Sequence, residues 1–285
     1  YLANGPGEFE VGGRPLGHWF DPLAALRRLR FADGGIEYAY RFVRSRDFAV
    51  ARETGRVRRP FPGTPPDRSA VGRLFDALRG AFPDNPVIGV CRLGGETLAV
   101  TESPVGLAVD PDDLTVRARY DLTAGLDADV TLGHLHRGPD GGAYNLGASY
   151  GREPAYTLFR RPPASAGGPP SPEPIARLRV DRSYLPYVHS FALAGPYALL
   201  PLPPFGVSPR DLLVGAVRGT SFCDAFDAHD DPTRFLVLDR RTGERVAAVP
   251  ADPAFVYHHA NGFVDDGAVV LDCVAYPDER AVTAL

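Results

Sequence analysis

Short apolar runs separated by glycine- and proline-rich turns recur along the whole chain, and they constrain its fold most strongly. The 31 glycines and 29 prolines make up roughly a fifth of the 285 residues, against about 12% in an average protein. The runs between them alternate apolar and polar side chains or are continuously apolar, which is typical of strands. They lie at residues 36–43, 87–93, 97–101, 114–120, 130–134, 156–159, 175–180, 188–193, 197–202, 235–238 and 269–274.

Turn dipeptides join many of these runs in pairs. Gly94-Gly95, Thr242-Gly243 and Asp266-Gly267 have the composition of tight hairpin turns, as do residues 33–34 and 140–142. Consecutive hairpins predict an all-β chain that runs as a β-meander, and about a dozen strands fit a β-propeller, a barrel or a large sandwich. In a propeller the inner strands approach one axis, so residues distant in sequence can meet there.

Two segments have helical spacing instead. Residues 211–217 form a short candidate helix, and residues 70–82 place apolar side chains on one helical face. Those side chains are Val71, Leu74, Phe75, Leu78 and Phe82. Residues 162–174 are proline-rich and predict a long surface loop. Because the strand pattern is alike on both sides of this loop, we expect one domain over residues 1–285.

The composition is that of a globular protein without a nucleic-acid partner. The net charge is −4, which leaves no basic footprint for nucleic acid. The sequence has no run of 18 apolar residues and no signal peptide, which favours a cytoplasmic location. Cys91, Cys223 and Cys273 have no metal-type spacing, so we expect buried free thiols. The chain begins at Tyr1 and has no Met, so we expect a trimmed N-terminus.

Histidines in apolar, aromatic surroundings are the main candidates for chemistry. His258 and His259 are adjacent within residues 255–263, and on a strand they point to opposite faces. His134 and His136 flank one residue and would share a face, where a two-ligand chelate is possible. His189 lies in a similar context. Taken singly, each is more often a structural histidine than a ligand, but three like contexts make a shared transition-metal site an equal alternative.

The remaining polar candidates are weaker. His18 could pack against Trp19 or cap a turn, and His229 lies in an acidic segment typical of a solvated loop. Glu102 follows an apolar run, so it is either a surface residue at a strand end or a carboxylate that accepts a hydrogen bond from a metal-bound imidazole. The sequence contains no serine-hydrolase elbow, phosphate-binding loop, Cys-x-x-Cys pair or His-Glu-x-x-His motif.

Several segments, in order along the chain, resemble the carotenoid cleavage oxygenases, a family of non-haem iron enzymes. They are residues 1–6 (YLANGP), 18–21 (HWFD), 134–136 (HLH) with 144–147 (YNLG), 187–191 (YVHSF) and 258–263 (HHANGF). The resemblance implies that His134, His189 and His258 are iron ligands, and that His136 and His259 are their neighbours rather than ligands.

The same resemblance implies roles for residues around the metal. Glu102 would orient His189 by accepting a hydrogen bond from its ring, and Thr101, Tyr187 and Phe226 would line the substrate cleft. The implied fold is a seven-bladed β-propeller with Fe(II) on its axis beneath a cap of a few helices. Family members carry a fourth histidine ligand near the C-terminus, beyond the position of Leu285, so the propeller is expected to be incomplete here, with its last blades missing.

The implied activity is cleavage of a conjugated double bond of a carotenoid or apocarotenoid by dioxygen, with two carbonyl products such as retinal. Two alternatives are a dioxygenase for phenolic stilbene-type substrates and an inactive truncated propeller without its fourth ligand. We expect a monomer with peripheral membrane contact, because carotenoids partition into bilayers. Residues 199–207, which include Leu202 and Phe205, are apolar enough to enter the bilayer surface.

Overall fold

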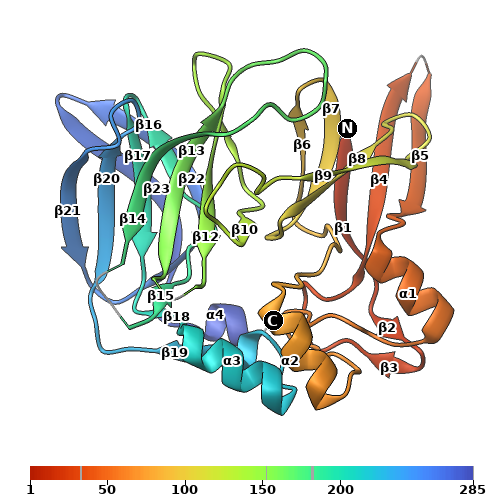
Figure 1. The fold of residues 1–285 in the computed structure, drawn as a ribbon. Helices are drawn as coiled ribbons and strands as arrows, with labels where there is room; N and C mark the ends of the chain where they lie inside the picture. The colour runs from red at the N-terminus through yellow and green to blue at the C-terminus, as the bar shows by residue number, and fades with distance from the viewer. Residues whose placement is uncertain (33, 152, 181–182, 285) are drawn as a thin grey trace.

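The computed structural model describes residues 1–32, 34–151, 153–180 and 183–284, and most of its regular structure is β (Figure 1). All strand pairs are antiparallel, and most sheets are built from consecutive hairpins. The β-meander architecture predicted from the turns is therefore confirmed. The 33–34 hairpin turn was also predicted, but Asp33 lies outside the described residues.

The first two sheets come from the N-terminal part of the chain. The first has the order β1-β4-β5, and the second is a regular meander of four strands, β6 to β9. A small hairpin, β2-β3, follows β1. The bounds are β1 Leu2–Glu8, β2 Glu10–Val11, β3 Arg14–Pro15, β4 Leu23–Ala32, β5 Gly35–Phe42, β6 Gly89–Leu93, β7 Glu96–Val100, β8 Val105–Val109 and β9 Val116–Asp121.

The next two large sheets form the main core. One pairs β10 and β11 with β12, which continues to β13 and β14, and the other has the order β16-β17-β20-β21. Their buried leucines, valines and aromatic rings pack in one cluster. The bounds are β10 Val130–Thr131, β11 His136–Arg137, β12 Ala143–Ser149, β13 Ala155–Arg161, β14 Glu173–Arg179, β16 Ala192–Ala194, β17 Tyr197–Leu202, β20 Thr233–Asp239 and β21 Arg245–Ala251.

Two further sheets complete the described strands. One has the order β15-β18-β19, and the other is the long hairpin β22-β23. The bounds are β15 Leu185–Pro186, β18 Phe205–Val207, β19 Phe226–Ala228, β22 Phe255–Asp265 and β23 Ala268–Tyr276.

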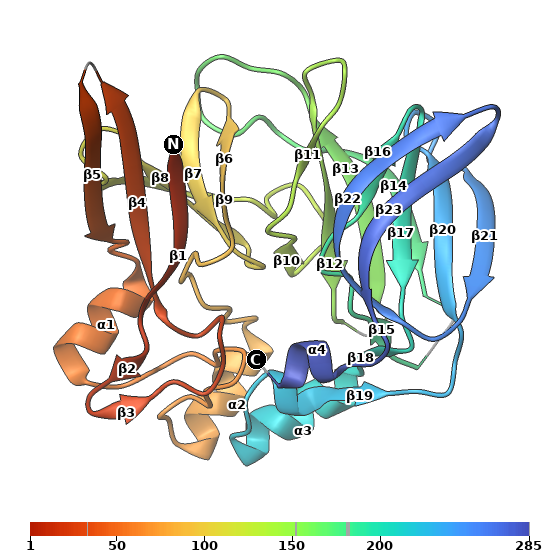
Figure 2. The same ribbon diagram turned by 180° about the vertical axis from the view of Figure 1, so that it is seen from behind.

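Four helices lie together at one end of the sheets (Figures 1 and 2). They are α1 Arg46–Thr54, α2 Ala70–Leu78, α3 Pro209–Arg218 and α4 Arg280–Thr283, with the short 3₁₀ helix η1 Cys223–Ala225. The serine hydroxyls of Ser45, Ser69 and Ser208 cap the starts of α1, α2 and α3. No helix among the described residues is long and apolar enough to span a bilayer.

Both predicted helices exist, but their bounds differ. The helix predicted over residues 70–82 ends at Leu78, because the chain turns at Gly80, which has a positive φ of 59°. The helix predicted over residues 211–217 is α3, which is longer by two residues at its N-terminus and by one at its C-terminus. Helix α1 was not predicted, since its polar sequence has no long apolar stripe.

Two predicted strands are shorter than expected, and both differences concern the site. The strand predicted over residues 130–134 ends at Thr131, and the one over 188–193 begins only at Ala192. His134 and His189 therefore lie in irregular segments beside strands rather than within them. Side chains in such segments do not have to alternate between two faces as they do in a strand.

The expectation that residues 199–207 enter a membrane is wrong. Leu199, Leu200, Leu202, Phe205 and Val207 are all at least 93% buried inside the protein. Their apolar character serves the core, because β17 is a central strand of its sheet and β18 is a central strand of another.

The proline-rich segment is a loop within one sheet. It connects β13 to β14, which pair directly, and Gly168 N donates a hydrogen bond of 3.1 Å to Gly94 O in the β6-β7 turn. The three cysteines are free, as predicted, but they are half-buried rather than buried.

Candidate metal centre

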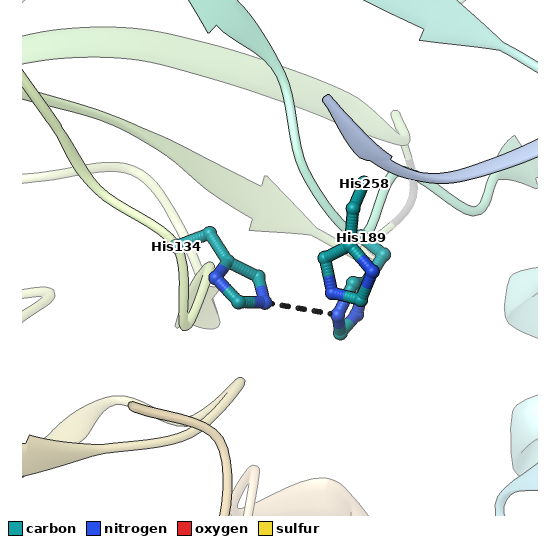
Figure 3. Close-up of side chains that lie close together, drawn as sticks. All are labelled: His134, His189 and His258. Atoms are coloured by element: carbon teal, nitrogen blue, oxygen red, sulfur yellow. Dashed lines mark hydrogen bonds between the residues drawn. The ribbon is translucent and has the colours of Figure 1, made fainter. Parts of the chain in front are cut away.

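Three histidines that are far apart in the sequence converge on one point (Figure 3). Each of His134, His189 and His258 offers one ring nitrogen, and these three atoms lie within 4.8 Å of one another. The Nε2 atoms of His134 and His189 are 3.1 Å apart. Nitrogens that bind one ion at about 2.1 Å and at right angles lie about 3 Å apart, so this spacing fits a shared transition metal.

Irregular backbone gives each histidine its direction. His134 follows β10 and precedes β11, and His189 lies between β15 and β16. His258 belongs to β22, but the pairing of β22 with β23 shifts register on both sides of the two adjacent histidines. A β-bulge of this kind redirects side chains, which explains how a strand residue can point towards His134 and His189 in two irregular segments.

The surroundings favour the neutral form of His134 and His258. Burial is the main cause that lowers the pKa of His134 to about 3, and the neighbouring His189 and His258 rings contribute to the same shift. Partial burial and the His189 ring also lower the pKa of His258, although its side chain is the most exposed of the three. A neutral imidazole has a free lone pair, which is the form that binds a metal ion.

Glu102 fixes the orientation of His189. Its Oε1 atom lies 2.6 Å from Nδ1 of His189, so the ring N–H donates to the carboxylate and Nε2 is left to face the centre. The Tyr187 hydroxyl donates to the same carboxylate over 3.1 Å. Burial and the charge of Glu102 hold the pKa of Tyr187 well above its usual range, so the phenol keeps its proton. The Glu102 side chain is only 18% exposed, and therefore it is not a surface residue at a strand end.

The second histidine of each pair points elsewhere. His136 packs edge-on against Phe191, with ring centroids 4.6 Å apart. His259 Nδ1 lies 2.8 Å from the hydroxyl of Ser190. Neither belongs to the three-histidine cluster, so the chelate considered for His134 and His136 does not form.

The two isolated histidines have structural contacts. His18 is buried, and its Nε2 donates to Val282 O over 2.8 Å while Nδ1 accepts from Phe20 N over 3.2 Å. His229 is half-buried and stacks on Tyr184 with centroids 3.6 Å apart, so the expectation of a fully solvated loop residue is wrong.

An apolar cavity of about 650 Å³ lies beside this cluster, since it is lined by Glu102 and Tyr187, which contact His189. Its lining includes Thr101, Tyr187 and Phe226, the three residues expected beside the substrate, together with Glu102. Phe20 also lines it and stacks on the His189 ring, with centroids 6.1 Å apart.

The outer part of the cavity was not anticipated from the sequence. It is formed by helices α2 and α3 and by aromatic residues such as Tyr150 and Phe222. These segments meet only through tertiary packing, and no local pattern in the sequence indicates that they share a cavity.

Comparison with known proteins agrees with this geometry. The sequence profile described as retinal pigment epithelial membrane protein matches residues 1–285. The chain belongs to the carotenoid oxygenase family. It is 29% identical over 296 residues to the chicken (Gallus gallus) β,β-carotene 15,15′-dioxygenase, a match that covers 97% of the chain.

Solved structures of this family share the fold. The apocarotenoid oxygenase of Synechocystis superimposes with a TM-score of 0.79 at 22% identity, over 97% of the chain. A cobalt-substituted form of the same oxygenase gives a TM-score of 0.78. The chain spans 56% of the length of the chicken enzyme and 57% of the Synechocystis chain.

Proposed function

We propose that this chain is the metal-binding part of a non-haem, Fe(II)-dependent dioxygenase that cleaves a conjugated double bond of a carotenoid or apocarotenoid. The products would be two carbonyl compounds. The observation that carries the proposal is the convergence of His134, His189 and His258 beside an apolar cavity whose lining includes Glu102, the hydrogen-bond partner of His189. An all-histidine donor set suits a divalent transition metal with open positions. Membership of the carotenoid oxygenase family supports the substrate class.

Each residue of the site would have a definite task. His134, His189 and His258 would hold Fe(II), which would supply the activation of dioxygen. Glu102 would keep the His189 ring in the orientation that presents Nε2. The apolar cavity, with Thr101, Tyr187 and Phe226 near its inner end, would exclude water and hold one double bond of the polyene beside the metal.

We further propose that the sheets are blades of a seven-bladed β-propeller. The meanders β6 to β9 and β16-β17-β20-β21 each have four antiparallel strands, which is the usual composition of a blade. The helices at one end of the sheets would be its cap. A closed ring would place the three histidines on the central axis.

Iron content and product formation in the complete gene product test this function. We expect one iron per protein and conversion of an apocarotenal to shorter carbonyl products. His134→Ala should lower iron content and remove product formation. His229→Ala, a change outside the cluster, should leave both intact. A folded wild-type protein that binds no iron would contradict the proposal and favour an inactive propeller.

We also propose peripheral membrane contact through the helix pair α2-α3. Val71 is 79% exposed, and Phe75, Leu213 and Val217 are each 45–49% exposed, so the pair presents an apolar face. Leu213 also lines the cavity, which places this face beside its outer end. A lipid-soluble polyene could therefore pass from a bilayer to the cavity without crossing water. Such a protein would be cytoplasmic and membrane-associated.

Liposome sedimentation tests this contact. The double variant Phe75→Asp/Leu213→Asp should bind vesicles about tenfold or more weakly, since two exposed apolar side chains are replaced by charges. The matched control is Ile36→Asp/Tyr38→Asp, because these side chains are 64% and 60% exposed but belong to β5, in the sheet β1-β4-β5, and not to α2-α3. Equal loss of binding in both double variants would contradict a specific role for α2-α3.

A further inference from the structure

A second cavity, of about 870 Å³, is strongly cationic. Among the described residues that line it, five are arginines and one is acidic, although the net charge of the whole chain is −4. The arginines are Arg14, Arg56, Arg58, Arg68 and Arg73, and the acidic residue is Asp67. Such a concentration of positive charge is unfavourable in the absence of anions, because the guanidinium groups repel one another.

The walls of this cavity are formed by closely packed backbone. The β2-β3 turn contacts the end of α1 so closely that a Cβ atom on Gly12 would collide with the carbonyl oxygen of Gly55. On another wall, Ser69 Oγ accepts a hydrogen bond of 3.2 Å from Gly72 N and fixes the start of α2. Three separate elements therefore hold the cavity in shape.

The five arginines differ in how they are already used. Arg14 pairs with Asp67 over 3.3 Å, and Arg68 pairs with Asp76 over 3.2 Å. Arg73 donates to the carbonyl oxygens of Ala216 and Val217 at the end of α3.

Arg56 and Arg58 are available for a ligand. Both are exposed, and neither makes a hydrogen bond or ion pair with any residue in the described part of the chain. Their donors can therefore bind a ligand without breaking an internal contact.

We propose that this cavity binds a phosphate group, carried by an anionic lipid or by a small phosphomonoester. The planar guanidinium fork matches two phosphate oxygens, and several forks can share one phosphate. No aromatic side chain occurs among the described lining residues, so the cavity offers no ring on which a nucleobase could stack. The proposal is independent of the oxygenase chemistry.

The position of the cavity favours a lipid headgroup as the source. Pro66 and Arg73 line both this cavity and the apolar one beside the histidine cluster. Val71, the most exposed apolar residue of α2, follows the lining residue Ser69 by two positions. An acidic headgroup in the arginine cavity would thus lie beside acyl chains on the α2-α3 face.

Titration with inorganic phosphate at constant ionic strength tests the phosphate site directly. We expect saturable binding and a rise in the unfolding temperature that chloride does not reproduce. Arg56→Ala/Arg58→Ala should weaken the affinity at least about tenfold, because charge-assisted hydrogen bonds are lost. Arg56→Lys/Arg58→Lys keeps the positive charge without the guanidinium fork, so its phosphate affinity should lie between those of the wild type and Arg56→Ala/Arg58→Ala. Arg41→Ala/Arg44→Ala removes the same charge from exposed arginines outside the cavity and should bind as the wild type does.

Vesicles distinguish the two sources of phosphate. One probe is binding to phosphatidylcholine vesicles that contain phosphatidic acid. If Arg56→Ala/Arg58→Ala loses this binding and the Arg41/Arg44 control keeps it, the ligand is a lipid headgroup, even if free phosphate binds weakly. Saturable binding of free phosphate with no effect of Arg56→Ala/Arg58→Ala on vesicle binding identifies a soluble phosphomonoester. If neither probe depends on Arg56 and Arg58, or if the Arg41/Arg44 control loses as much binding, the proposed site is wrong.

Discussion

The carboxylate of Glu102 links the histidine cluster to the protein around it. It accepts hydrogen bonds from Nδ1 of His189 and from the Tyr187 hydroxyl. With these two hydrogen bonds, the carboxylate can hold the imidazole in one orientation and one tautomer. Partners of this kind increase the basicity of a metal-binding imidazole and determine its direction.

Glu102→Gln should therefore weaken metal binding. An amide has no charge and can present its NH₂ group to the ring, so the orientation of His189 is no longer fixed. We expect metal affinity to fall by about 10- to 100-fold, measured by competition with a chelator of known affinity. The control is Glu96→Gln, which changes a glutamate on β7 that contacts Tyr120 and not the histidines. Unchanged affinity in Glu102→Gln would show that Glu102 does not position the ligand.

The choice between paired histidines could not be made from spacing alone. Alternation on a strand separates His258 from His259, but it does not say which one faces the centre. For His134 and His136 the same rule predicted a shared face, and the structure shows them apart because His134 precedes the strand. The resemblance to a family identified the three histidines that converge, whereas local periodicity did not.

At the scale of one element, the start of α1 depends on a pair of buried carboxyl groups. Asp84 accepts hydrogen bonds from the backbone N–H groups of Arg46 and Asp47, and Asp47 in turn accepts one from Asp84 N over 2.6 Å. Burial, followed by the charge of Asp84, raises the pKa of Asp47 to about 7. Burial acts to raise the pKa of Asp84 as well, but hydrogen bonds from Asp47 and the charge of Arg119 outweigh it and lower the value.

These shifts predict a pH-dependent stability with a defined sign. Asp47 has a higher pKa in the folded than in the unfolded chain. Its contribution to the free energy of unfolding is therefore full below about pH 4 and is lost as the pH rises through about 7. Asp84 has a lowered pKa and stays ionised above about pH 4, so its contribution to the free energy of unfolding is constant as the pH rises from about 4 through 7. The free energy of unfolding should fall between pH 5.5 and pH 8 by about 2 kcal/mol.

Asp47→Asn should remove this dependence, because an amide resembles the protonated acid and can donate to Asp84 at every pH. Urea unfolding at pH 5.5 and pH 8 measures the difference. Asp113→Asn is a suitable control, since Asp113 lies on an exposed turn and its pKa is lowered by hydrogen bonds from Thr115. If Asp47→Asn kept the wild-type pH dependence, the carboxyl pair would not be its source.

At the scale of the whole molecule, the hairpins were predictable and the cavity was not. Adjacent strands joined by turns such as Gly94-Gly95 are encoded locally, because a positive φ at both glycines is enough to reverse the chain. The cavity needs α2 and α3 to meet, although Ala70 and Pro209 are far apart in sequence. The apolar run 199–207 was misread for the same reason, since hydrophobicity alone does not distinguish a core strand from a membrane contact.

The histidine cluster also connects distant parts of the molecule. His134 lies 55 residues from His189 in the sequence, and each of the three histidines belongs to a different segment of the fold. A metal held by all three would join these segments in the folded state only, since the unfolded chain does not bring the histidines together. Metal binding should then stabilise the whole molecule and not just the site.

Unfolding temperatures with and without metal test this coupling. Under anaerobic conditions Fe(II) at 100 times its Kd should stabilise the protein by about 2.7 kcal/mol, and a chelator should reverse the effect. His258→Ala should remove most of this shift while retaining the metal-free unfolding temperature, because its side chain is exposed. His229→Ala should retain the shift. A stabilisation that persisted in His258→Ala, or disappeared in His229→Ala as well, would mean that the metal acts elsewhere on the chain.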